Sequence, residues 1–147
     1  MAEIPPPAIG PGDILLEMKA CGLCGTDLAK LSQSQESSAV RLGHEFAGVV
    51  RAVGAEVVRF APGDRATAAH HVPCGTCWAC QHGSESMCPQ FKATNVDPCG
   101  FAEMIRIPQL HVERVAFRLP DGMTYEEASF TEPLACAVRA VERSQAL

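Results

Sequence analysis

The sequence predicts a mainly β domain with helices at its C-terminal end, in the form of a small barrel or sandwich. Three observations favour this class: short apolar stretches recur between Gly and Pro turn signals, a cysteine-rich segment interrupts them as an excursion, and only the end of the chain has a helical pattern. The chain has 147 residues, of which 47% are hydrophobic, so one domain with a core is expected.

The N-terminal part predicts two strands and a short helix. Residues 13–21 alternate between apolar and charged side chains, which is typical of a half-buried strand. Gly22 and Gly25 end this strand and leave Cys24 on a tight turn. Residues 28–41 predict a short helix followed by an exposed loop, and the Val-rich residues 46–53 predict a second strand.

The middle of the chain predicts three more extended segments. Residues 65–69 follow a Pro-Gly-Asp turn signal, and residues 101–107 and 112–119 follow the cysteine-rich segment. Pro108 and Pro120 stand at the ends of the last two segments, where a missing amide is tolerated in a strand.

The C-terminal residues, about 124–145, predict two helices. Thr124 and Glu127 have the spacing of a capping box, so a helix should begin there. Pro133 should interrupt it and serve as the first residue of the second helix. An apolar stripe is predicted on that second helix by Leu134, Val138 and Val141.

The cysteine-rich lobe, about residues 73–90, predicts a structural zinc site. Its C-x2-C-x2-C-x7-C spacing is formed by Cys74, Cys77, Cys80 and Cys88. Four thiolates can close a tetrahedral shell around one zinc ion and leave no open position. Two disulfides, four free thiols, or His82 in place of one cysteine are the alternatives. The chain opens without a secretory signal, which argues against disulfides and favours the cytoplasm.

A second group predicts an open metal site. Cys24 follows one strand, and His44 and Glu45 directly precede the next. Three protein ligands that leave a position for water or substrate distinguish catalytic from structural zinc. The alternative from spacing alone is a buried thiol and a hydrogen-bonded histidine. Glu132 is a possible further ligand, or a simple charge at the start of a helix.

Charge and hydropathy exclude other classes of protein. The net charge of −5 argues against a nucleic-acid partner, including one bound by a zinc ribbon. No apolar run approaches the roughly 20 residues that a membrane span needs, so no membrane partner is expected. The other three cysteines, Cys21, Cys99 and Cys136, are expected to be buried thiols.

The motifs together resemble a known family. Residues 22–27 (GLCGTD), 43–48 (GHEFAG) and 63–65 (GDR) and the four-cysteine loop occur in the order found in zinc-dependent medium-chain dehydrogenases. Glu132-Pro133-Leu134 is similar to the branch that contains sorbitol and threonine dehydrogenases. The resemblance implies a GroES-like, partly open barrel for the whole chain, 1–147.

The resemblance also implies two zinc ions per chain and roles for particular residues. Cys24, His44, Glu45 and Glu132 would surround the catalytic zinc, with either glutamate as the third protein ligand. Thr26 would receive the proton of the substrate alcohol, and Asp27 would orient His44. Ala29 stands where many relatives carry a histidine for proton exit, so Lys30 or water would have to replace that route.

The nucleotide-binding part of the family is not in this sequence. The Gly-x-Gly at residues 10–12 lies in a proline-rich lead-in, and Leu15 occupies the third glycine position. We therefore expect a catalytic domain trimmed at both ends and inactive alone. With its missing domain it should oxidise a small-molecule alcohol or polyol with NAD or NADP, as a homo-oligomer. A non-catalytic zinc scaffold or redox-responsive module is the alternative.

Overall fold

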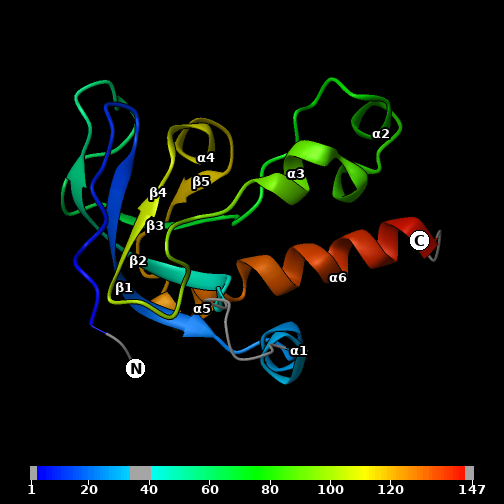
Figure 1. The fold of residues 1–147 in the computed structure, drawn as a ribbon, viewed down its shortest axis with the longest axis horizontal. Coiled ribbons are helices and arrows are strands. Elements are labelled where there is room, and N and C mark those ends of the chain that lie inside the picture. Colours follow the sequence, from blue (N-terminus) through cyan, green and yellow to red (C-terminus); the bar gives the residue numbers. More distant parts are fainter. Residues whose placement is uncertain (1–2, 34–40, 145–147) are drawn as a thin grey trace.

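A five-stranded antiparallel sheet forms the body of the chain (Figure 1). The computed structural model describes residues 3–33 and 41–144, so the predicted loop at 34–40 lies outside the described residues. The strands, in the spatial order β4-β1-β2-β3-β5, are β1 (Ile14–Gly22), β2 (Glu45–Val53), β3 (Arg65–Ala68), β4 (Met104–Ile107) and β5 (Ala116–Arg118). Within the described part of the chain no pairing joins β4 to β5, so the sheet stays open.

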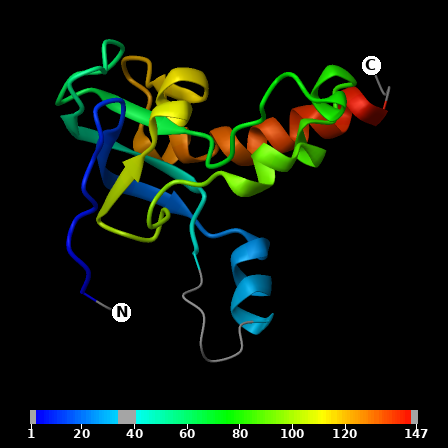
Figure 2. The same ribbon diagram turned by 45° about the horizontal axis from the view of Figure 1, so that its top comes forward.

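Helices connect and flank the strands. They are α1 (Gly25–Gln33), α2 (Trp78–Gln81), α3 (Pro89–Ala93), α4 (Gln109–Arg114), α5 (Tyr125–Ser129) and α6 (Thr131–Ser144), with a 3-10 turn η1 at Glu85–Met87. The short helix α5 packs against β1 and β2. The excursion that carries α2, η1 and α3 leaves the sheet and runs beside α6 in both views (Figures 1 and 2). No helix in the described ranges is long and apolar enough to span a membrane.

The core lies on one face of the sheet. Alternating side chains of β1, Ile14 and Leu16, are fully buried, and Ile105 and Ile107 of β4 pack beside them in register. Phe46 of β2 is also buried, at 1% exposure. The period of two is the pattern expected when one sheet face is covered and the other is accessible.

Most of the predicted strands are confirmed, and one is wrong. Residues 112–119 do not form a single strand: α4 ends at Arg114, and only β5 is extended. The amides of His111 and Val112 donate to the carbonyl of Pro108, at 2.8 and 3.0 Å, and wind the chain into a helical turn. His111 and Val112 are both buried, so this short helix covers the core with adjacent side chains, which an alternating pattern does not anticipate.

Several boundaries also differ from the prediction. Strand β4 begins at Met104 rather than at residue 101, and α1 already begins at Gly25. The capping box is confirmed, because Thr124 Oγ1 accepts from the amide of Glu127 at 3.1 Å and Glu127 Oε2 accepts from the amide of Thr124 at 2.7 Å. The break between the two C-terminal helices falls at Phe130, so Pro133 lies within the first turn of α6 and does not start it.

The predicted apolar stripe of α6 is not covered by the described residues. Leu134 is 62% exposed, Val138 48% and Val141 42%. The helix has no buried residue and depends for its position on polar contacts with the lobe, described below.

The fully buried Ile105 gives a test of the core. Replacement by Ala removes methylene groups and leaves a cavity, so we expect the free energy of unfolding to fall by about 2–5 kcal/mol. Val58→Ala, at a side chain that is 93% exposed, should change it by less than about 0.5 kcal/mol. Urea denaturation of the zinc-loaded variants would measure both, and equal effects would contradict this placement of the core.

Candidate metal centres

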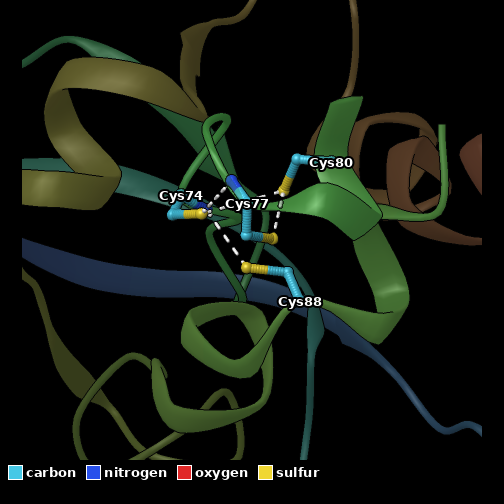
Figure 3. Close-up of side chains that lie close together, drawn as sticks. All are labelled: Cys74, Cys77, Cys80 and Cys88. Carbon is cyan, nitrogen blue, oxygen red and sulfur yellow. Dashed lines mark hydrogen bonds between the residues drawn. The ribbon is translucent and has the colours of Figure 1, made fainter. Parts of the chain in front are cut away.

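The four cysteines of the lobe converge on one point (Figure 3). Their sulfur atoms all lie within 4.8 Å of one another. Sγ of Cys77 is 3.5 Å from Sγ of Cys80, and Sγ of Cys74 is 3.9 Å from the same atom. These separations are close to the 3.8 Å or so between sulfurs that share a tetrahedral zinc at about 2.3 Å. All eight cysteines of the chain are free, so no disulfide forms here.

Backbone and side-chain donors prepare one of these sulfurs for ionisation. Sγ of Cys74 accepts from the amides of Thr76 and Cys77, at 3.5 and 3.3 Å, and from the Thr76 hydroxyl at 3.6 Å. The Thr76 amide, followed by its hydroxyl, lowers the pKa of Cys74 to about 6. Burial raises the pKa of Cys80 to about 12, so Cys80 needs a cation beside it to become a thiolate at neutral pH.

His82 does not join this cluster. Its Nδ1 hydrogen-bonds with the carbonyl of Trp78 at 2.8 Å, and its ring stacks on Trp78 with centroids 4.3 Å apart. The four-sulfur set is therefore the one that the lobe presents to a metal.

Arginine side chains tie the lobe to the rest of the fold at two places. Arg114 Nη1 donates to the carbonyls of Pro73 and Cys74, each at 3.2 Å. Arg139 of α6 donates through Nη2 to the carbonyl of Gly83 at 2.7 Å, and Arg143, one turn further along, donates to the same carbonyl. Gly83 has a φ of +68°, a conformation that glycine adopts without strain.

The second candidate centre lies where β1 ends and β2 begins. The antiparallel pairing sets Gly22 opposite Glu45, so Cys24 on the following turn comes close to His44. The ligand atoms of Cys24, His44 and Glu45 all lie within 4.8 Å of one another. The structure thus brings together three residues from two separate loops.

A buried carboxylate holds this group in place. Asp27 is fully buried; its Oδ2 accepts from the amide of Cys24 at 3.1 Å and its Oδ1 from the amide of Gly43 at 3.0 Å. Oδ1 also lies 3.5 Å from Nδ1 of His44. Burial tends to raise the pKa of Asp27, but the two amides and His44 outweigh it, so the pKa stays below its usual value.

The remaining ring nitrogen of His44 is turned the other way. Its Nε2 lies 3.4 Å from Oγ1 of Thr26, an exposed residue. A histidine that gives one nitrogen to a carboxylate and keeps the other for a metal is the usual arrangement at zinc sites. Close packing at the end of β1 favours glycine at position 22, because a Cβ on Gly22 would lie 2.1 Å from Oε2 of Glu45.

Both groups fit zinc by their chemistry. The lobe offers four sulfur donors, and the second group offers a sulfur, an imidazole nitrogen and a carboxylate oxygen, all of which zinc accepts in proteins. The lobe offers four ligands and the second group offers three. A closed zinc site has four protein ligands, whereas an open one has three and leaves a position for water or substrate.

Glu132 is not part of the three-residue group. It lies in the first turn of α6, and its Oε1 accepts from Sγ of Cys136 at 3.7 Å. Its role as a zinc ligand stays a prediction. Cys136 is exposed rather than buried, because it lies on a helix without buried residues. Cys99 is buried as predicted, and Cys21 only partly.

A cavity of about 340 Å³ opens beside the second group. His70 and His71 line it after β3, Glu132 and Arg139 line it from α6, and Phe91 lines it from the lobe. His70 connects the cavity to the second group, because its ring centroid is 4.9 Å from that of His44. Burial lowers the pKa of His70 to about 3, so its ring is neutral at physiological pH.

Sequence reasoning left most of these wall residues without a role. Phe91 follows the four-cysteine motif and Arg139 lies near the C-terminal end, and nothing in the sequence pattern indicates that the two share a cavity. Only the folding of the lobe against α6 brings them together.

The sheet, the four-cysteine lobe and the Cys-His-Glu group define a GroES-like domain of the zinc-dependent dehydrogenase type. Residues 10–121 match the family model described as the alcohol dehydrogenase GroES-like domain, and the chain belongs to this family. It is 36% identical to the sorbitol dehydrogenase of Bacillus subtilis in an alignment of 149 positions, which covers 97% of this chain and 41% of that protein.

Solved structures of dehydrogenases are also similar to this chain. The chain matches galactitol-1-phosphate dehydrogenase from Escherichia coli with a TM-score of 0.79 and 32% identity, over 98% of this chain and 41% of that one. It also matches a protein from Sinorhizobium meliloti described as a zinc-binding dehydrogenase, bound to NADP, with a TM-score of 0.78 and 35% identity, over 95% of this chain and 40% of that one. The chain therefore spans about two-fifths of the length of these relatives.

The two centres predict separable metal losses. We expect two zinc ions per chain, of which Cys77→Ser should remove one and lower the melting temperature sharply, since structural zinc contributes directly to folding. His44→Ala should remove the other and leave the fold largely intact. Elemental analysis and thermal melting would measure both effects.

Cys136→Ser is the matched control, because this exposed cysteine belongs to neither group. It should retain both ions. Unchanged zinc content and melting in Cys77→Ser would refute the structural assignment of the lobe.

Proposed function

We propose that this chain is the catalytic, zinc-binding part of an NAD(P)-dependent dehydrogenase that oxidises a small-molecule alcohol. The observation that carries the proposal is the Cys24–His44–Glu45 group, which lies apart from the four-cysteine lobe and adjoins a cavity. The match to the alcohol dehydrogenase GroES-like domain supports it. We further propose a cytoplasmic, homo-oligomeric enzyme in which Glu132 completes the ligand set.

Zinc at the Cys24–His44–Glu45 group would act as a Lewis acid that makes the hydroxyl of an alcohol more acidic. Asp27 would keep the imidazole of His44 in one orientation, because it is anchored by two backbone amides and cannot turn away. The hydroxyl of Thr26 lies 3.4 Å from Nε2 of His44, the ring nitrogen that is not beside Asp27. It would accept the proton of the alcohol and pass it to solvent, to which Thr26 is exposed.

Two features bear on the rest of the enzyme. Ala29 carries no group that could receive a proton, and the ammonium of the exposed Lys30 has no lone pair to accept one, so the proton would leave from Thr26 to water. The exposed stripe of α6, formed by Leu134, Val138 and Val141, offers an apolar face. We propose that a nucleotide-binding domain packs there, as part of the three-fifths of the relatives that this chain does not span.

The proposal is tested with the longest natural polypeptide that contains this chain and a nucleotide-binding segment. It should bind NADH or NADPH and oxidise an alcohol. Thr26→Val should lower kcat by about 10²–10⁴-fold, the contribution of a positioned proton acceptor, while zinc content and nucleotide binding stay unchanged. Thr26→Ser keeps the hydroxyl and should retain most of the activity.

A polypeptide with full zinc content that binds no nicotinamide nucleotide would overturn the dehydrogenase assignment. A non-catalytic zinc-binding scaffold would then be the better description. Full activity in Thr26→Val would leave the enzyme class intact but remove Thr26 from the proton path.

A further inference from the structure

We infer that the cavity beside the Cys24–His44–Glu45 group binds alcohols through an aromatic or similarly apolar substituent, and that arylmethanols suit it better than polyols. The inference concerns the substrate class and rests on the proposed function for the reaction. The binding preference itself follows from the walls of the cavity. Several relatives are named for polyols, such as sorbitol and D-altritol. The class of alcohol inferred for this cavity is a different one.

The position of the cavity makes it the place for the substituent of an alcohol. His70, on its wall, lies against His44 with ring centroids 4.9 Å apart. Glu132 lines the cavity from α6 and interacts with Cys136, also on the wall. A hydroxyl at the metal-binding group would therefore direct its substituent along these residues into the space between the sheet and α6.

Two of the three hydroxyl groups on the wall, those of Thr67 and Thr131, are already engaged within the protein, and the third belongs to Ser86. Oγ1 of Thr67 donates to the carbonyl of Phe46 at 2.7 Å. Oγ1 of Thr131 donates to the carbonyl of Ala128, also at 2.7 Å. Both donors are thus satisfied before any ligand enters.

Two titratable side chains further along the wall, His71 and Arg139, are engaged as well, whereas the buried Nδ1 of His70 has no partner among the described residues. Nδ1 of His71 hydrogen-bonds with the carbonyl of Thr94. Arg139 pairs through Nη1 with Oε2 of Glu85 at 3.3 Å and donates through Nη2 to the carbonyl of Gly83 at 2.7 Å. The positive charge of Arg139 is neutralised by Glu85, so the wall offers no free positive charge for a phosphate. The hydroxyl of Ser86, Nδ1 of His70 and the carboxylate of Glu132 remain, which are fewer hydrogen-bonding groups than a polyol with a hydroxyl on every carbon requires.

The cavity should bind a polyol weakly. It carries a hydroxyl on every carbon, and each hydroxyl that leaves water without a partner weakens binding. The existing hydrogen bonds of the wall would have to break to satisfy them. An apolar substituent makes no such demand and gains from leaving water.

Aromatic and small side chains supply the complementary surface. Phe91 lies against His71 with ring centroids 4.9 Å apart, and Phe117 adds a ring that is 52% exposed at the opening. Ala68 and Ala135 leave the space between them open. An apolar cavity of about 150 Å³ can hold benzene. The 340 Å³ present here has room for a phenyl ring and a short side chain.

The test measures binding of benzyl alcohol and of sorbitol to the zinc-loaded chain by NMR titration. We expect benzyl alcohol to bind about tenfold or more tightly than sorbitol, the effect of a few unsatisfied hydroxyl groups. Ala135→Phe places a ring in the cavity from an exposed helix position, so it should weaken benzyl alcohol binding by about tenfold or more.

Ala137→Phe is the matched control. It makes the same substitution at an exposed position of the same helix that does not line the cavity, and should leave both affinities unchanged. Phe117→Ala is an independent variant that removes a wall ring at the surface; it should weaken benzyl alcohol binding and leave sorbitol binding as it was. Amide spectra would verify that each variant is folded.

Sorbitol binding as tight as benzyl alcohol binding, no detectable benzyl alcohol binding, or no effect of Ala135→Phe would each overturn the inference. Its failure is distinct from failure of the proposed function, because binding needs neither nucleotide nor turnover. An enzyme that oxidises sorbitol faster than benzyl alcohol would defeat the inference alone. A chain that binds benzyl alcohol, in a polypeptide that oxidises no alcohol, would defeat the dehydrogenase proposal alone.

Discussion

The buried carboxylate of Asp27 is the interaction on which the candidate catalytic group depends. It takes hydrogen bonds from the amides of Cys24 and Gly43 and lies beside Nδ1 of His44. These contacts join the turn after β1 to the start of β2, two segments between which α1 lies in the chain. A carboxylate with so many donors around it stays ionised, and a charge buried without them would be costly. The arrangement of Cys24 and His44 is therefore held by contacts within the protein itself.

Local patterns in the sequence predicted those parts of the fold that local physics determines. The alternation in β1 and the capping box at Thr124 have short-range causes, and both are confirmed. The strand predicted at residues 112–119 is wrong, because the alternating pattern includes residues that fold into α4 after Pro108. The stripe on α6 has the correct period, but period alone does not say which partner covers it.

The candidate metal centres and the cavity divide in the same way, into parts that local spacing predicts and parts that depend on the assembled fold. The spacing of the four cysteines predicts their cluster, because ligands three or eight residues apart can meet in one loop. Cys24 and His44 are twenty residues apart, and family resemblance rather than spacing favoured their meeting. The cavity could not be predicted at all. Its walls come from β3, the lobe, β5 and α6, and its polarity depends on hydrogen bonds such as Arg139 to Gly83 that exist only after these parts assemble.

The lobe has a further consequence for how such domains can diverge. It contributes Phe91 and Glu85 to the cavity but none of the three side chains of the Cys24 group. Its own four sulfurs are fixed by their spacing, whereas the residues between Cys80 and Cys88 are free of that requirement. Mutations of Glu85 or Ser86 in this short loop can therefore reshape the wall of the cavity without changing either set of candidate ligands, so evolution can alter the cavity independently of the two groups.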